Sequence, residues 1–234
     1  MNKESFIEEL KKINIIINDN QLKQLELYYE LLIEWNEKIN LTGITEKNEV
    51  YLKHFYDSST MNMVINLNNV KKLCDIGTGA GFPGIVIKIL FPNIFVTLVD
   101  SLEKRCKFLN IVINELKLDN IEVIHDRAED FSKKHREEYD VVTSRAVAKL
   151  NTLLEYSVPI AKINGKIIEL KGNIQDELEK SMNAITKLDI EIEKIYNFKL
   201  PYENSNRNII VFNKKKSTNI IYPRKISEMK KNSL

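Results

Sequence analysis

The stretch Leu73-Cys74-Asp75-Ile76-Gly77-Thr78-Gly79-Ala80-Gly81-Phe82-Pro83-Gly84 decides the fold of this chain. Four of the seven glycines of the protein lie between residues 77 and 84, directly after a short apolar run that contains an acid. Glycine adopts positive φ angles and lets a ligand come close to the backbone. An apolar strand followed by such a loop and then by a helix is how α/β proteins bind nucleotides. The stretch therefore predicts a nucleotide-binding loop at the end of a strand.

Short apolar runs alternate with helical patterns on the C-terminal side of this loop. The pattern predicts strands over residues 70–76, 95–100, 121–125, 139–144 and 165–170, helices over 84–90, 104–116, 153–161 and 176–188, and closing strands over 191–198 and 209–212. Such alternation is typical of βαβ units with right-handed crossovers. We therefore expect an α/β fold with a doubly wound, mostly parallel, Rossmann-like sheet.

Residues 3–65 have a helical pattern instead, which predicts an N-terminal helical extension. Asn18 and Gln21 have the spacing of a capping box, and Gly43 is a natural place for the helix to end. A second helix over residues 50–64 carries His54 and Asp57, which are three residues apart and can pair. We expect a structural role for this histidine rather than a catalytic one.

The composition and the two ends of the chain limit the class of protein. The chain has 234 residues, a net charge of +2 and two cysteines, too few for a disulfide framework or a cysteine metal site. No apolar run approaches the roughly 18 residues that span a bilayer, and no secretory signal pattern stands at the N-terminus. We therefore expect a cytoplasmic protein without a metal or a membrane partner. The lysines and arginines after residue 213 form either a solvated end or a nucleic-acid contact.

Three ligands compete for the glycine loop. A P-loop is excluded because no Gly-Lys-Ser/Thr follows the loop, whereas residues 79–84 formally fit the dinucleotide motif G-x-G-x-x-G. Asp75 favours S-adenosylmethionine, because its carboxylate would hold the ammonium group of a methionine moiety and repel a pyrophosphate. Asp100, at the end of the next strand, would bind ribose hydroxyls. We expect S-adenosylmethionine, held by Asp75, Asp100 and the glycine loop with Gly77 and Gly79.

Polar residues also follow the later strands of the predicted sheet. The carboxyl ends of parallel strands share one edge, so the segment with Ala128 and Glu129 would lie beside the adenine of a bound nucleoside. Arg145, in Ser144-Arg145-Ala146, would lie where the methyl acceptor meets the cofactor. Lys171, in Lys171-Gly172, is a similar but weaker candidate.

The motifs together resemble one family, bacterial ribosomal RNA small subunit methyltransferase G, also called glucose-inhibited division protein B. The resemblance extends over nearly the whole chain, as far as residues 222–225. The motifs that carry it, in the family's order, are Trp35-Asn36 with Asn40-Leu41-Thr42, His54 with Asp57-Ser58, the glycine stretch from Asp75 to Gly84, Asp100-Ser101-Leu102 with Lys104-Arg105, Arg127-Ala128-Glu129, Ser144-Arg145-Ala146 and Lys171-Gly172.

The resemblance implies a class I methyltransferase that uses S-adenosylmethionine to methylate N7 of a guanine in the 530 loop of 16S ribosomal RNA. It implies that the cofactor lies on Gly77 and Phe82, on Ala128 and Glu129, and near Arg145. Phe82 would cover the cofactor with an apolar face. The implied partner is 16S ribosomal RNA or the small ribosomal subunit, and we expect a monomer.

The implied reaction explains why no catalytic acid–base pair stands out in the sequence. Guanine N7 has a lone pair and no proton, so its methylation needs no general base. Arg145 and Lys171 are therefore expected to position a phosphate or the base. The alternatives are a methyltransferase of a small molecule or a protein, a nicotinamide-dependent oxidoreductase, and a ribosome-binding module without activity. On this basis we divide the chain into a helical subdomain (1–65), a methyltransferase domain (66–213) and a basic tail (214–234).

Overall fold

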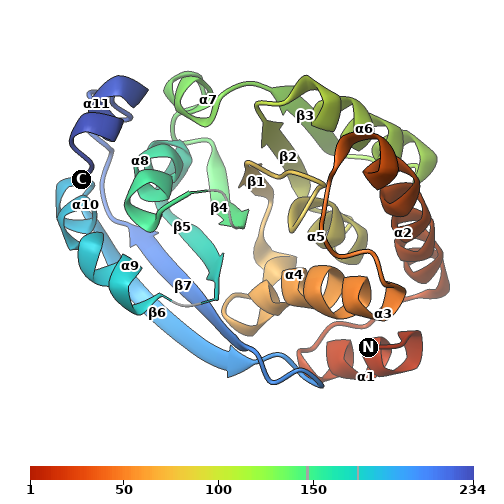
Figure 1. The fold of residues 1–234 in the computed structure, drawn as a ribbon. Coiled ribbons are helices and arrows are strands. Elements are labelled where there is room, and N and C mark those ends of the chain that lie inside the picture. Colours follow the sequence, from red (N-terminus) through yellow and green to blue (C-terminus); the bar gives the residue numbers. More distant parts are fainter. Residues whose placement is uncertain (146–147, 173) are drawn as a thin grey trace.

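A seven-stranded sheet lies at the centre of the computed structural model, which describes residues 1–145, 148–172 and 174–234 (Figure 1). Its strand order is β3-β2-β1-β4-β5-β7-β6; β7 runs antiparallel to both β5 and β6, and the other neighbouring pairs are parallel. The strands are β1 (Lys72–Ile76), β2 (Phe95–Asp100), β3 (Ile121–His125), β4 (Tyr139–Arg145), β5 (Ala161–Lys171), β6 (Ile190–Lys199) and β7 (Asn206–Lys214). The predicted doubly wound, mostly parallel sheet is confirmed.

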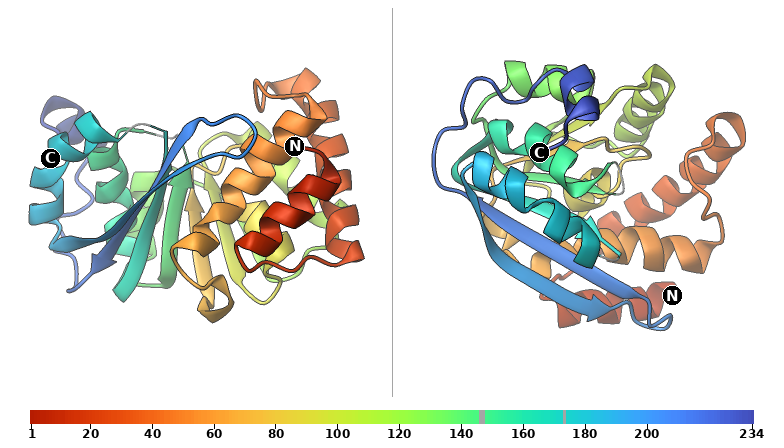
Figure 2. Two further views of the ribbon diagram at one scale, coloured as in Figure 1. Left: turned by 90° about the horizontal axis from the view of Figure 1, so that it is seen from below. Right: turned by 60° about the vertical axis from the view of Figure 1, so that its left-hand side comes forward.

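Helices cover both faces of the sheet (Figure 2). The helices of one face are α1 (Lys3–Lys12), α2 (Asp19–Ile39), α3 (Lys47–Val50), the π-helical turn η1 (Tyr51–Tyr56), α4 (Asp57–Ser59), the 3₁₀ turn η2 (Thr60–Met63), α5 (Gly84–Leu90) and α6 (Glu103–Glu115). The helices of the other face are α7 (Ala128–Lys134), α8 (Leu150–Ile160), α9 (Gln175–Lys180), α10 (Met182–Lys187) and α11 (Ile226–Lys231). A 3₁₀ turn, η3 (Leu67–Asn69), leads into β1.

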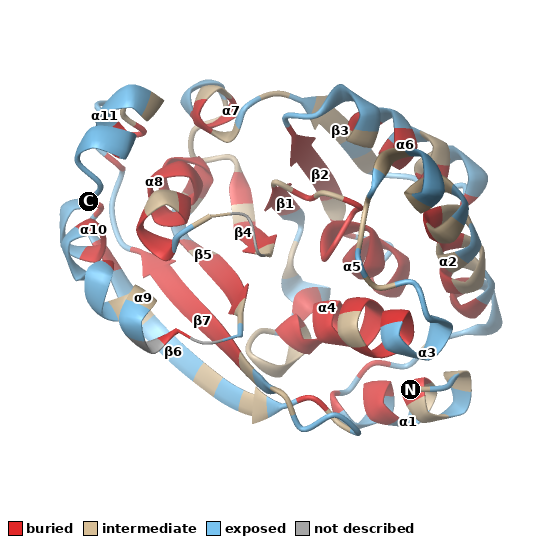
Figure 3. Cartoon of the chain, in the orientation of Figure 1, coloured by how far each residue is buried: buried red, intermediate tan, exposed pale blue. Residues whose placement is uncertain are grey.

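Alternate residues of each strand serve the two faces, as the pleat of a strand requires. Leu73 of β1 belongs to an apolar core with Leu25 of α2, whereas the next residue, Cys74, belongs to a second core with Leu154 of α8. Figure 3 shows the central strands buried and the edge strand β6 alternating between partly buried and exposed positions. Two cores, one on each face, therefore hold the three layers together.

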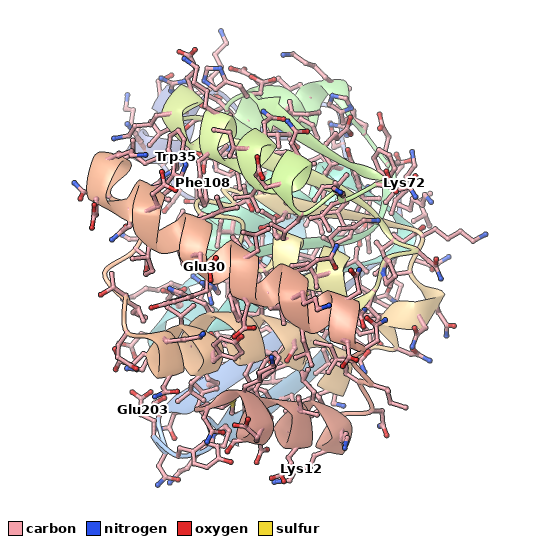
Figure 4. The ribbon with its side chains drawn as sticks, turned by 90° about the vertical axis from the view of Figure 1, so that its right-hand side faces the viewer. Lys12, Glu30, Trp35, Lys72, Phe108 and Glu203 are labelled. Atoms are coloured by element: carbon pink, nitrogen blue, oxygen red, sulfur yellow. The ribbon has the colours of Figure 1, made fainter. Side chains whose placement is uncertain are left out.

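The N-terminal helices are part of the first core, which confirms the predicted helical extension. Phe6, Tyr28 and Phe55 are fully buried in the cluster that also contains the strand residues. Trp35 of α2 packs on Phe108 of α6, with 6.1 Å between the ring centroids (Figure 4). Because this core joins the helices to the sheet, the division of the chain at residues 65 and 213 stays a prediction.

The start of α2 is as predicted, but its end is not. The Asn18 side chain accepts the N–H of Gln21 and the Gln21 side chain accepts the N–H of Asn18, which completes the capping box. The helix ends at Ile39, with Asn40 in the left-handed conformation at a φ of 50°. The Asn36 side chain then accepts the N–H groups of the next two residues. The prediction that Gly43 ends the helix is wrong, because asparagine can itself adopt the left-handed cap.

Four helical segments also differ from the sequence pattern. The helix expected over residues 50–64 is a composite of α3, η1, α4 and η2, and the one expected over 176–188 is divided into α9 and α10. The short helices α7 and α11 were not predicted. These segments have fewer than eight residues, too few for a helical periodicity to stand out in the sequence.

Residues 214–234 do not form a free tail. Lys214 is the last residue of β7 and is fully buried, with its ammonium group donating to the Ala161 carbonyl at 2.8 Å. The guanidinium of Arg224 binds both carboxylate oxygens of Glu155 on α8, each at 2.8 Å, and only 1% of the Glu155 side chain is exposed. The rest of the segment, including α11, thus lies against the second face of the sheet. A contact between its exposed lysines and RNA stays a prediction.

The Arg224–Glu155 pair provides a test of this arrangement. We expect Arg224→Met to lower the free energy of unfolding by about 3 kcal/mol, because it leaves a buried carboxylate without its cation. Urea unfolding measures the change, and Lys225→Met, at an exposed neighbour, is the matched control. If the two variants have the same stability, the C-terminal segment is not held by this pair.

Candidate active site

A cavity of about 720 Å³ lies at the carboxyl ends of β1, β2 and β4, where the strand order reverses. Open α/β sheets bind their ligands at this point. The cavity walls come from the glycine loop, from residues 99–101 and 126–129, from the end of β4, and from the segment before η1. The cavity has the size of a site for a molecule such as S-adenosylmethionine.

Asp75 stabilises the glycine loop from the buried side. Its carboxylate is fully buried, and Oδ2 accepts hydrogen bonds from the Thr78 hydroxyl at 2.7 Å and from the Gly84 N–H at 2.9 Å. Burial raises the pKa of Asp75 to about 6, against the effect of these two hydrogen bonds. Asp75 is not among the residues that line the cavity, although its Oδ1 has no hydrogen-bond partner among the described residues. Its contact with an ammonium group therefore stays a prediction.

The loop fits closely against α2. A Cβ atom on Gly81, where φ is +101°, would lie 2.7 Å from the Tyr28 hydroxyl oxygen and 2.5 Å from Cδ1 of Ile85. The Tyr28 hydroxyl donates to the Ala80 carbonyl at 2.5 Å. Only glycine meets both the backbone angle and the space at this position. The N-terminal helix thus fixes the outer side of the loop, whereas Gly77 and Gly79 line the cavity itself.

Asp100 joins the loop after β1 to the loop after β2. Its Oδ2 accepts the Gly79 N–H at 2.9 Å, its Oδ1 accepts the Leu102 N–H at 2.9 Å, and Arg105 lies 3.5 Å from Oδ2. The carboxylate lines the cavity and is only 3% exposed. A carboxylate oxygen can accept two hydrogen bonds. The Asp100 carboxylate therefore retains capacity for the predicted contact with ribose hydroxyls.

The segment after β3 forms another wall of the cavity. Ala128 and Glu129 are the first residues of α7, and both line the cavity. The N–H groups in the first turn of a helix have no acceptor within the helix, so they are available to a ligand. Tyr156 of α8 and Ile226 of α11 complete this side. The sequence pattern did not indicate these two residues, because they reach the cavity only through the packing of α8 and α11.

Arg145, Phe82 and His54 form one stacked group at the opposite wall. The guanidinium carbon of Arg145 lies 5.0 Å from the centroid of the Phe82 ring, and the His54 ring stacks on Phe82 at 4.4 Å between centroids. Arg145 donates to Nδ1 of His54 at 2.9 Å and to the carbonyl of Lys53 at 3.0 Å. The predicted placement of Arg145 and Phe82 at one cavity is therefore observed.

His54 is neutral in this arrangement. Burial and the neighbouring Arg145 lower its pKa to about 3. Because Nδ1 accepts a hydrogen bond from Arg145, the ring proton lies on Nε2, which donates to the Thr42 hydroxyl at 2.8 Å. Both nitrogens are occupied, so His54 has no free lone pair for acid–base chemistry. The expected structural role of this histidine agrees with these contacts.

Asp57 does not pair with His54 as the spacing predicted. Its carboxylate accepts from Nε of Arg207 at 3.1 Å and lies 3.5 Å from Nη1 of Arg145. A neutral imidazole cannot form an ion pair, whereas two guanidinium groups can. Among the described residues, the side chains of His54 and Asp57 are thus linked only through Arg145.

Lys171 lies beside this cavity and not on its wall. Its ammonium group donates to the Ala148 carbonyl at 2.9 Å and pairs with Glu177 at 2.9 Å. Lys171 lines a second, smaller cavity of about 290 Å³. Its predicted role toward the acceptor stays a prediction, and Ala146 of the Ser-Arg-Ala motif lies outside the described residues.

Neither a cluster suited to a metal ion nor a helix able to cross a membrane occurs within residues 1–145, 148–172 and 174–234. No group of three or more histidine, cysteine, aspartate or glutamate side chains there has the arrangement of a metal site. No helix there combines the length and apolar character that crossing a membrane requires.

Two solved structures with a similar fold are a methylase and a methyltransferase. A ribosomal protein L11 methylase from Lactobacillus delbrueckii subsp. bulgaricus superposes with a TM-score of 0.55 at 13% identity, covering 70% of this chain and 79% of that one. An S-adenosylmethionine-dependent O-methyltransferase from Thermotoga maritima superposes with a TM-score of 0.52 at 14% identity, covering 80% and 72%. At these identities the likeness concerns the fold alone.

Sequence comparison identifies the family. The model of rRNA small subunit methyltransferase G matches residues 21–210. The ribosomal RNA small subunit methyltransferase G of Bacillus subtilis is 51% identical over 96% of this chain and 95% of its own length. The protein of the same name from Exiguobacterium sibiricum is 45% identical over the full length of both chains. The chain therefore belongs to the ribosomal RNA small subunit methyltransferase G family.

Proposed function

We propose that this enzyme transfers a methyl group from S-adenosylmethionine to N7 of a guanine in the 530 loop of 16S ribosomal RNA. Its family makes it a methyltransferase of small-subunit ribosomal RNA that uses S-adenosylmethionine. We further propose that it acts in the cytoplasm as a monomer. The observation that carries the proposal is the cavity with the glycine loop, Asp100 and Arg145 on its walls.

The residues of the cavity suit the parts of S-adenosylmethionine. Asp100 would bind the ribose hydroxyls, the backbone at Ala128 and Glu129 would bind the adenine, and Phe82 would provide an apolar contact. The glycine loop gives a polar backbone close to the ligand, with Gly77 and Gly79 at φ angles of 66° and 62°. The carboxylate of Asp75 supplies negative charge beneath this loop, close to where an ammonium group would lie.

The chain needs to orient the acceptor and exclude water, and it does not need to remove a proton. When bound, S-adenosylmethionine supplies a methyl group whose C–S bond breaks with both electrons remaining on sulfur, while the N7 lone pair forms the new bond. His54 is held between Arg145 and Thr42, and Asp57 between two arginines, so neither acts as a base. Alignment of the reactants alone is worth several kcal/mol. Arg145 lines the cofactor cavity, and it would provide that alignment where the acceptor base meets the cofactor.

The acceptor base must leave any RNA helix before it reaches this cavity. Guanine N7 lies in the deep major groove of A-form RNA, which side chains do not enter. The target guanine is therefore single-stranded or turned out of its stack when it reacts. Lysines and arginines around the cavity rim would hold the RNA backbone with salt-dependent affinity.

A map of modified nucleotides tests the proposed reaction. We expect ribosomal RNA from cells that contain the protein to carry one 7-methylguanine in the 530 loop, and RNA from a deletion strain to lack it. Mass spectrometry of RNA fragments identifies the base and the position. An unchanged 7-methylguanine content after deletion would contradict the proposal.

Replacement of Arg145 tests its role at the wall. We expect Arg145→Ala to lower the methylation rate by about 100-fold or more, because His54, Phe82 and Asp57 all lose their shared partner. The dissociation constant of S-adenosylmethionine and the melting temperature, measured in parallel, separate this effect from loss of the cofactor or of the fold. Methylation at the unchanged rate would remove Arg145 from the mechanism.

The pH dependence of cofactor binding tests Asp75. With a pKa of about 6 in the fold, the carboxyl is mainly neutral below that pH and charged above it. If it attracts the ammonium group, affinity for S-adenosylmethionine rises about tenfold between roughly pH 5 and pH 7, as calorimetry measures. Asp75→Asn should remove this rise, whereas Asp140→Asn, at the other end of the sheet, should retain it. A flat profile in the wild-type protein would limit Asp75 to holding the loop.

The same shift has a consequence for stability, with a defined sign. The folded-state pKa is above the ordinary value of 3.8, so the contribution of Asp75 to folding is fully present below that value. It is lost as the pH rises through about 6. We therefore expect Asp75→Asn to make the free energy of unfolding of the cofactor-free protein less dependent on pH in this range, as urea titrations measure.

A further inference from the structure

We propose that the cavity of about 290 Å³ beside the cofactor cavity holds the target base, and that Arg207 selects guanine there. The inference rests on the function proposed above. The two cavities share His54 and Arg145 as wall residues. A base in the smaller cavity would thus lie next to the cofactor, and for transfer its N7 must reach the methyl group past the edge of this shared wall. Its volume is at the lower end of the range for small-molecule sites, which suits one base and excludes a duplex.

The two main walls of this cavity suit a flat ring. One wall is the surface of the sheet, with Leu170 of β5, Ile209 of β7 and Phe198 of β6. Leu170 pairs with Ile209 across the strands, and Phe198 pairs with Arg207, so these side chains lie on one face. The other wall is formed by η1, α4 and Thr60. Apolar and aromatic faces of this kind stack on unpaired bases.

Two arginines of the cavity, Arg145 and Arg207, bind one buried carboxylate, that of Asp57. Asp57 is 7% exposed, and its two oxygens face Nε of Arg207 at 3.1 Å and Nη1 of Arg145 at 3.5 Å. Nη1 of Arg207 donates to the Ser205 hydroxyl and to the Asn206 carbonyl, each at 3.1 Å. Nη2 of Arg207 has no hydrogen-bond partner among the residues of the described ranges. Asp57 thereby fixes the orientation of the Arg145 and Arg207 guanidinium groups, and Nη2 of Arg207 remains able to donate a hydrogen bond to a ligand.

This arrangement favours guanine over adenine. Arginine is only a donor of hydrogen bonds, and Asp57, the one acid among the described residues of the cavity wall, is occupied by the two arginines. Guanine presents two acceptors, O6 and N7, whereas adenine presents N7 and an amino donor. Because N7 must remain free to react, the arginine contact falls on O6. An adenine in the same place would direct its amino group at a donor.

A third cavity adjoins the smaller one beside β6 and β7. It has a volume of about 1050 Å³ and shares Gly172, Phe198, Arg207 and Asn208 with the smaller one. Lys199 of β6 also lines it. We place the RNA strand that carries the extruded base along these adjoining cavities, from the β6–β7 side of the sheet to the cofactor cavity. Arg207 stands at the entrance to the base site, because it lines both outer cavities.

Arg207→Met tests this assignment, with Lys194→Met on the neighbouring strand as the matched control. Lys194 is exposed and lines none of the three cavities. We expect Arg207→Met to lower kcat by about 10- to 100-fold, since the base loses its orientation. The dissociation constant of S-adenosylmethionine should change by less than about twofold, because Arg207 is outside the cofactor cavity.

A binding experiment without cofactor gives a second readout. The probes are two RNA fragments of the 530 loop, one with the target guanine and one with adenine in its place, each with 2-aminopurine next to the target. Extrusion of the target unstacks the 2-aminopurine and raises its fluorescence. We expect the wild-type protein and Lys194→Met to prefer the guanine fragment, and Arg207→Met to lose about tenfold of that preference. Arg207→Lys keeps a cation on Asp57 and should be folded and intermediate.

The outcomes separate this inference from the proposed function. If wild-type protein methylates N7 and Arg207→Met keeps both the rate and the base preference of Lys194→Met, the base site is wrong and the function stands. If wild-type protein methylates another atom, the function and the base site both fail. If Arg207→Met does not fold, the base preference of Arg207→Lys decides, and a wild-type preference in that variant overturns the role of Arg207.

Discussion

The hydrogen bonds that Asp75 accepts determine the shape of the cofactor loop, and most of the active site depends on that shape. One buried oxygen receives the Thr78 hydroxyl and the Gly84 N–H, which join the end of β1 to the start of α5. Asp100 then joins the middle of the loop to β2. A buried carboxylate is costly, as its raised pKa indicates, and the two donors offset only part of this cost. The hydrogen bonds to the buried Asp75 carboxylate hold both ends of the loop in one conformation.

Asp57 has the corresponding role for the acceptor side. It lies in the N-terminal helices, but its partners Arg145 and Arg207 are 88 and 150 residues further along the chain. One carboxylate thus joins the helical extension, the end of β4 and the strand β7. Removal of a partner from a buried charge of this kind is costly, so the three segments keep one arrangement. The N-terminal helices are therefore part of the site and not only a cover for the sheet.

The sequence predicted what depends on neighbours along the chain. The strand ends that carry Asp75, Asp100, Ala128 and Arg145, and the capping box at Asn18, follow from local patterns whose geometry is fixed over a few residues. The pairing of Arg145 with Asp57 and the cavity contact of Ile226 depend on how distant elements pack, which no local pattern encodes. A position at the carboxyl end of a strand does not by itself place a side chain in the cavity, as Lys171 shows. It ends its strand as expected, but its ammonium group binds Glu177 and a carbonyl beside the cavity.

If the smaller cavity holds the base as proposed, the wall that it shares with the cofactor cavity makes the two ligands thermodynamically dependent on each other. Arg145 and His54 face both spaces, so a molecule that shifts either side chain from one side changes the free energy of binding on the other. Linkage requires the two effects to be equal: the factor by which the methyl donor changes the affinity for the base is the factor by which the base changes the affinity for the donor. A single arginine held between two cavities would thus couple the affinities of the two reactants, whichever of them binds first.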